Sequence, residues 1–80
     1  MKTYLLTNYQ TGEAYVGTTH QRLIDRLYAH GSMANSGECD HTPLYKNMKE
    51  YGTSSFFIEL LCEGDREEEF IAKLRPSLNG

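Results

Sequence analysis

Arg26 and His30 have the residue types and the spacing of a pair that acts together. They lie four residues apart in a segment with helical apolar spacing, so their side chains project from the same helix face. A guanidinium binds anionic oxygens, and an imidazole exchanges protons near neutral pH. No carboxylate lies three or four residues from Arg26 to pair with it. The plainer interpretation is a surface arginine and a histidine that suits the negative end of a helix dipole.

A carboxylate, Glu67, lies on the apolar side of the last helical segment. Positions 67, 70, 71 and 74 share one helix face, and three of them are Phe70, Ile71 and Leu74. This pattern predicts a carboxylate at the head of a buried line of side chains. The alternative is that Glu67 only compensates the helix dipole in the first turn.

Two tyrosines, Tyr4 and Tyr15, lie on neighbouring β-like runs where their rings could meet across a strand pair. Six tyrosines and no tryptophan are present in the 80 residues. Cross-strand tyrosines also make good half-buried sheet surface, so packing alone could explain the pair.

Short strands and helices must hold these side chains. Strands are predicted at 2–8 and 14–18, joined by a turn at 9–13, and at 56–62. The third run, FFIELLC, is almost continuously apolar, which predicts burial on both of its faces.

Three helices and one long loop complete the predicted order. The first helix covers 21–30 and ends at Gly31, a small-residue loop covers 31–43, and the second helix covers 44–51 and ends at Gly52. Asp65 and Glu68 fit a capping box for the last helix, which Pro76 stops. The order ββααβα predicts an α+β fold, with a small three-stranded antiparallel sheet flanked by helices.

Composition limits the class of protein. Eighty residues fit one domain, 1–80, and no apolar run approaches the roughly 20 residues of a membrane span, so a cytoplasmic, non-membrane protein is expected. Two cysteines are too few for a disulfide framework. The net charge of −3 argues against nonspecific binding of nucleic acid over the whole surface. Five of the eleven acidic residues lie within 63–69, so the rest of the chain is close to neutral.

Several ordered residues and two motifs resemble the catalytic domain of GIY-YIG endonucleases. KTY at 2–4, followed by Asn8, stands where the family has Gly-Ile-Tyr and an asparagine, and YVG at 15–17 matches the second signature. The family's order then continues with two threonines and a helix that carries Arg and then His. It ends with PLYKNMKEYG at 43–52, FFIELL, a Glu before Phe-Ile and a terminal Asn. The resemblance spans the whole chain and implies the family's fold.

The resemblance implies hydrolysis of DNA phosphodiester bonds at a single-metal site. Glu67 would hold one Mg²⁺ or Mn²⁺ ion, and Arg26 would clamp a nonbridging phosphate oxygen. Tyr4 would position and deprotonate the attacking water, supported by Tyr15 and His30. The sequence leaves open which of these three groups takes the proton.

Further residues would contact or orient the substrate. Asn79 would orient neighbouring groups or touch phosphate, Gly17 would permit close backbone approach, and Thr18 and His41 could reach the DNA backbone. For Thr18 and His41, a solvated side chain is the plainer interpretation.

The partners follow from the same resemblance. The expected substrate is DNA, including branched or nicked DNA, with specificity supplied by a homodimer or a partner protein in the cytoplasm, or in the host cytoplasm for a virus or mobile element. Lys2-Thr3 replace the family's Gly-Ile, and Glu13 stands where some relatives carry a basic residue. These departures keep a second hypothesis open, a degenerate module that binds nucleic acid or protein without cleaving it.

Overall fold

The computed structural model describes residues 1–37 and 42–79. Its elements in chain order are β1 (Lys2–Asn8), β2 (Ala14–Thr19), α1 (Leu23–Ser36), α2 (Pro43–Tyr51), the 3₁₀ turn η1 (Thr53–Ser55), β3 (Phe56–Glu63), α3 (Glu67–Leu74) and the 3₁₀ turn η2 (Ser77–Asn79). The strands form one antiparallel sheet, which confirms the predicted α+β fold and the order ββααβα.

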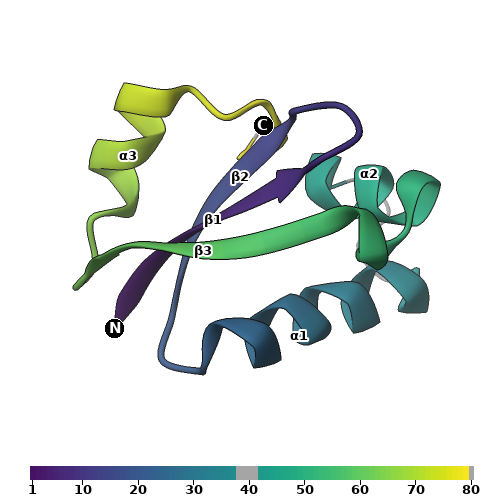
Figure 1. Cartoon of the computed structure of the whole chain (residues 1–80), viewed down its shortest axis with the longest axis horizontal. Coiled ribbons are helices and arrows are strands. Elements are labelled where there is room, and N and C mark those ends of the chain that lie inside the picture. Colours follow the sequence, from purple (N-terminus) through teal and green to yellow (C-terminus); the bar gives the residue numbers. More distant parts are fainter. Residues whose placement is uncertain (38–41, 80) are drawn as a thin grey trace.

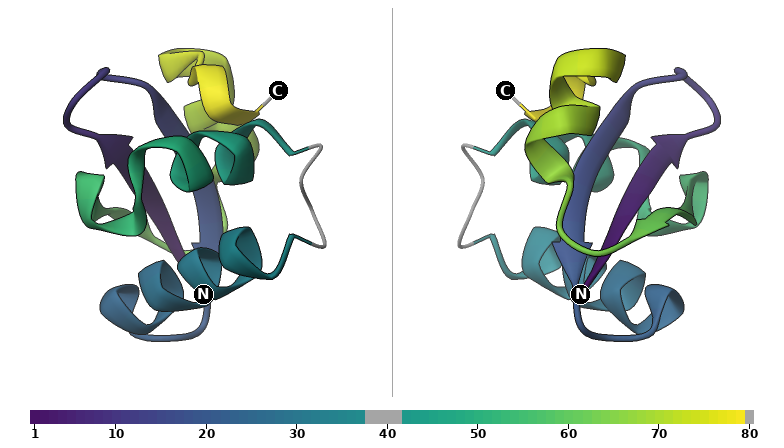
Figure 2. Two further views of the ribbon diagram at one scale, coloured as in Figure 1. Left: turned by 90° about the vertical axis from the view of Figure 1, so that its right-hand side faces the viewer. Right: turned by 90° about the vertical axis from the view of Figure 1, so that its left-hand side faces the viewer.

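The sheet has the strand order β2-β1-β3, so β1 lies in the centre. Figure 1 shows α1 and α3 on opposite sides of the strands, and both views of Figure 2 agree. Alternate residues of β1 point to the same face. On that face Tyr4 and Leu6 pack in a core with side chains of α1 and α2, among them Leu27, Leu44 and Met48. The first tyrosine therefore lies inside the core rather than on a sheet surface.

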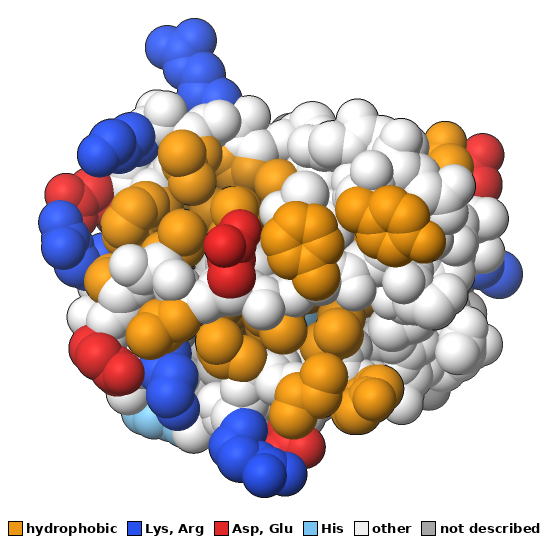
Figure 3. Space-filling model, viewed as in Figure 1, with side chains coloured by type: hydrophobic (Ala, Val, Ile, Leu, Met, Phe, Trp, Pro, Cys, Tyr) orange, Lys and Arg blue, Asp and Glu red, His pale blue; other side chains and the backbone are white. Residues whose placement is uncertain are grey.

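The prediction that 56–62 is buried on both faces is wrong. β3 is an edge strand, and Phe57 and Leu60 keep 45% and 46% of their surface exposed. Figure 3, in the same view as Figure 1, shows hydrophobic side chains at the surface on this side of the molecule, with charged groups mostly around them. The continuous apolar run thus reflects a surface rich in hydrophobic residues, not a central strand.

Helix α1 is longer than predicted because Gly31 does not end it. The helix runs to Ser36 and stops at Gly37, whose φ of 76° is left-handed. A Cβ on Gly31 would lie 2.7 Å from Oγ1 of Thr53, so the glycine lets α1 approach η1 closely. The predicted loop at 31–43 is therefore helical in its first part, and 38–41 lie outside the described residues. In the described ranges no helix is long and apolar enough to cross a membrane.

Helix α3 also differs from its prediction. Its N-cap is Arg66, one residue later than the capping box of Asp65 and Glu68 predicts, and Asp65 Oδ1 accepts only a long hydrogen bond from the Glu67 N–H (3.5 Å). None of its residues is buried, so Glu67 heads a half-buried line rather than a buried one. The start of the helix is held instead by buried Thr3, whose hydroxyl donates to the Gly64 carbonyl (2.7 Å) and accepts from the Arg66 N–H (2.9 Å).

Candidate active site

Tyr4 and Tyr15 meet across the hairpin because of the strand register. Tyr4 pairs with Gly17, so Tyr15 is its diagonal neighbour on the same face, with ring centroids 6.4 Å apart. A Cβ on Gly17 would press on Tyr4 Oη and lie 2.6 Å from Tyr4 Cζ and 2.9 Å from a Tyr15 ring carbon. Gly17 therefore makes room for the two rings and is itself buried beneath them.

The Tyr4 hydroxyl lies between Arg26 and His30 on α1. Arg26 Nε donates to Tyr4 Oη at 3.3 Å, and Tyr4 Oη lies 2.6 Å from His30 Nε2. The other ring nitrogen of His30, Nδ1, lies 2.9 Å from Tyr45 Oη on α2, and the Tyr15 ring meets His30 edge-on at a centroid distance of 5.6 Å. We call these five residues, Tyr4, Tyr15, Arg26, His30 and Tyr45, the tyrosine–histidine cluster.

Burial keeps the two central groups of the cluster neutral. Desolvation raises the pKa of Tyr4 to about 12, although its hydrogen bond from Arg26 acts in the opposite direction. Desolvation, helped by the Arg26 charge, lowers the pKa of His30 from 6.5 to about 4. At neutral pH, Tyr4 is therefore a phenol and His30 an imidazole with one free lone pair available as an acceptor.

This lowered histidine pKa predicts a loss of stability in mild acid. In the unfolded chain, His30 binds a proton near the ordinary histidine pKa of 6.5. In the folded protein it binds one only near pH 4, because its pKa is lowered to about 4. The histidine's contribution to stability is therefore present above pH 6.5 and is lost as the pH falls toward 4. We expect the His30 contribution to fall by about 2 kcal/mol between pH 7 and pH 5.

Urea unfolding at the two pH values measures this loss. The wild type should lose about 2 kcal/mol more on acidification than His30→Gln, while His20→Gln, a change at an exposed histidine, should behave like the wild type. The same pH dependence in His30→Gln and the wild type would contradict a buried, neutral His30.

Glu67 lies within electrostatic reach of the cluster. Its negative charge adds to desolvation in raising the pKa of Tyr15. Residues 65–69 line a hollow of about 460 Å³ at the start of α3, and the Glu67 side chain is half-buried there. The carboxylate is thus accessible to a cation from solvent and lies within electrostatic range of Tyr15.

The chemistry of the Glu67 carboxylate fits a weakly held divalent metal ion that prefers oxygen ligands. Glu67 supplies a carboxylate, the ligand type that Mg²⁺ and Mn²⁺ prefer. The described residues contain no group of three or more His, Cys, Asp or Glu side chains that could hold an ion by themselves. A divalent ion at Glu67 would therefore depend on water and on phosphate oxygens for most of its coordination shell.

Two other predicted site residues, Asn79 and Thr18, do not add a side chain to the cluster. The Asn79 side chain accepts from the Val16 N–H (2.7 Å) and donates to the Val16 carbonyl (2.8 Å), so it clamps the free edge of β2. Thr18 is next to Gly17 in β2, so its side chain points to the face of the sheet opposite the Tyr4 and Tyr15 rings. His41 lies outside the described residues.

Two residues of structural importance were missed from the sequence. Tyr45 lies in the second predicted helix and in the PLYKNMKEYG segment of the resemblance, but nothing in the sequence shows that its hydroxyl meets His30. Thr3 is part of the departure from the family's Gly-Ile, yet its hydroxyl holds the chain that leads into α3. A buried threonine in a central strand gives no local signal of such a partner.

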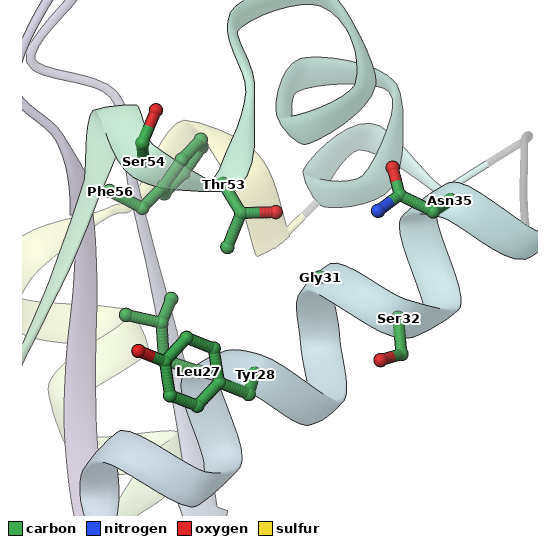
Figure 4. A pocket seen from close by; sticks show the side chains of 8 residues that line it. All are labelled: Leu27, Tyr28, Gly31, Ser32, Asn35, Thr53, Ser54 and Phe56. Atoms are coloured by element: carbon green, nitrogen blue, oxygen red, sulfur yellow. The ribbon is translucent and has the colours of Figure 1, made fainter.

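Another groove in the described residues lies elsewhere on α1. It has a volume of about 460 Å³ and is lined by Leu27, Tyr28, Gly31, Ser32, Asn35, Thr53, Ser54 and Phe56. Figure 4 shows it between α1 and the segment that enters β3. Positions 28, 32 and 35 lie on the side of the helix away from 26 and 30, and the lining carries no Lys, Arg, Asp, Glu or His. This groove lacks the groups for phosphate chemistry.

Comparisons with known proteins leave the chain without a family assignment. No family model, no curated protein and no solved structure matches it.

Proposed function

We propose that this chain is a metal-dependent endonuclease of the GIY-YIG type that hydrolyses DNA phosphodiester bonds. The observation that carries the proposal is the position of Tyr4 Oη, held between a permanent cation, Arg26 Nε, and a neutral proton acceptor, His30 Nε2. A phenol in this position can take a proton from water while passing its own proton on. A buried structural tyrosine needs one acceptor for its hydroxyl proton, but it does not need a cation as a second partner.

The proton path follows from the protonation states. Because the pKa of Tyr4 is raised to about 12, a free phenolate is scarce at neutral pH, so Tyr4 acts by relay rather than as a preformed base. As water attacks phosphorus, Tyr4 Oη would accept the water proton and its own proton would move to His30 Nε2. Because Tyr4 is fully buried, this step requires the side chains around its hydroxyl to part and admit the water. A bound phosphate anion offsets the Arg26 charge, which is one of the two causes that lower the His30 pKa, and so makes His30 a better acceptor.

Arg26 and Glu67 supply the charge that the reaction needs. Arg26 uses Nε for Tyr4, which leaves its two terminal nitrogens to bind nonbridging phosphate oxygens. When bound at Glu67, a divalent ion would stabilise the charge that develops on the phosphate and on the leaving 3′-oxygen. Thr3, which replaces the family's isoleucine, ties the start of α3 to the sheet through its two hydrogen bonds and so helps to position Glu67.

Arg26→Lys should lower kcat by about 10²-fold while changing the KM for DNA little. Lysine keeps the positive charge, so DNA is still attracted, but it has no planar fork to reach Tyr4 and phosphate together. Steady-state cleavage kinetics measure both constants. Arg22→Lys is the matched control, since Arg22 lies one helical turn away, is exposed and pairs with Asp25. Equal effects of the two changes would contradict the assigned role of Arg26.

Cleavage of a panel of DNAs tests the proposal itself. Supercoiled plasmid, linear, nicked and branched DNA are incubated with the protein and Mg²⁺, Mn²⁺ or a chelator. Strand cleavage that requires the metal supports the nuclease and ranks its substrates. Binding to any of these DNAs without cleavage at high protein concentration would instead favour a degenerate binding module.

A further inference from the structure

The buried hydrogen bonds around His30 fix the direction in which each proton points. Arginine is only a donor, so Tyr4 Oη must accept from Arg26 Nε. Within the described residues, the other hydrogen bond of Tyr4 Oη is to His30 Nε2 at 2.6 Å, and Tyr4 is fully buried. A buried hydroxyl proton without an acceptor is costly, so the Tyr4 O–H points at Nε2. His30 Nε2 is therefore an acceptor and carries no proton.

The remaining proton of the neutral imidazole must then lie on Nδ1. Tyr45 Oη lies 2.9 Å from that nitrogen and can accept its proton, and the two rings are in contact at a centroid distance of 5.7 Å. His30 is only 2% exposed, so water cannot easily replace this acceptor. Tyr45 comes from α2, a different element from the one that carries His30. The packing of α2 on α1 thus controls the proton of the histidine.

We propose that Tyr45 is a positioning residue that holds the His30 proton on Nδ1 and so keeps Nε2 ready to accept the proton of Tyr4. In the other tautomer, Nε2 would carry a proton and could only donate to Tyr4, which blocks the transfer from Tyr4 to His30. The catalytic consequence depends on the proposed nuclease function. The tautomer itself does not.

Nitrogen-15 NMR of the full chain with labelled histidine tests the assignment, because protonated and unprotonated ring nitrogens have widely separated shifts. At pH 7, wild-type His30 should show a protonated Nδ1 and an unprotonated Nε2. Tyr45→Phe keeps the ring but removes the acceptor, so part of the population should move its proton to Nε2. Tyr51→Phe, on the same helix but outside the cluster, should leave the His30 shifts unchanged.

Cleavage kinetics give the second readout. Tyr45→Phe should lower kcat by about tenfold, equivalent to about 1.4 kcal/mol, with little change in the KM for DNA. A proton on Nε2 in the wild type, or an unchanged tautomer in Tyr45→Phe, would overturn the proposal. If no form cleaves DNA, the nuclease proposal fails, while the NMR comparison still decides the role of Tyr45.

Discussion

Glu67→Gln should abolish cleavage, with a loss of roughly 10³-fold or more, while the protein stays folded. Glutamine has the shape of glutamate but lacks the charge that holds a divalent ion, and such an ion contributes several kcal/mol to the reaction. Glu67 is half-buried on a helix with no buried residue, and no packing is lost. The melting temperature of the variant should therefore equal that of the wild type or lie slightly above it, because a partly desolvated charge is removed.

Glu68→Gln is the matched control for that change. Glu68 is exposed in the same first turn, so its substitution alters the helix charge equally but leaves the Glu67 carboxylate in place. Cleavage by Glu68→Gln should stay near the wild-type rate. A large fall in melting temperature for Glu67→Gln would show that Glu67 is structural, and equal losses in both variants would show a general charge effect.

Tyr4→Phe should lower kcat by about 10²- to 10⁴-fold, the range that a positioned acid–base group contributes. The change removes the hydroxyl that joins Arg26 to His30 and leaves the core ring in place. It also leaves the buried Nε2 of His30 without its donor, which costs about 1–3 kcal/mol of stability. Cleavage is therefore measured well below the melting temperature of the variant.

The control for Tyr4→Phe is Tyr9→Phe, which removes a hydroxyl from a tyrosine that is 65% exposed in the hairpin turn. Its cleavage rate should equal that of the wild type. If Tyr4→Phe kept more than about a tenth of the wild-type kcat, Tyr4 would not carry the proton, and the relay through His30 would be wrong.

The elements were more predictable from the sequence than their environments. Alternation and turn residues predict the β1–β2 hairpin, and Gly52 ends α2 where expected, with a φ of 85°. Gly31 misled the prediction because a buried glycine inside a helix has the same sequence signal as a helix stop, and only its contact with Thr53 distinguishes the two. An apolar run such as FFIELLC likewise does not reveal whether its strand lies at the centre or the edge.

The candidate site was predicted in part for similar reasons. The four-residue spacing of Arg26 and His30 requires them to share a helix face, and the hairpin register brings Tyr4 and Tyr15 together. Asn79 and Tyr45 depend on contacts between distant parts of the chain, which spacing does not encode. Spacing therefore identifies groups that share a helix or a hairpin, and it does not reveal the contacts of Tyr45 with His30 or of Asn79 with Val16.

A divalent metal ion held at Glu67, within electrostatic range of Tyr15, is the most specific expectation of the proposed nuclease. Addition of Mn²⁺ to ¹⁵N-labelled protein, bound to a short DNA with uncleavable phosphorothioate linkages, tests this because the ion broadens nearby NMR signals. Broadening should centre on the amides of Glu67 and Tyr15 and disappear in Glu67→Gln but not in Glu68→Gln. Broadening centred on other acidic residues, or unchanged in Glu67→Gln, would contradict a metal-dependent site at this position.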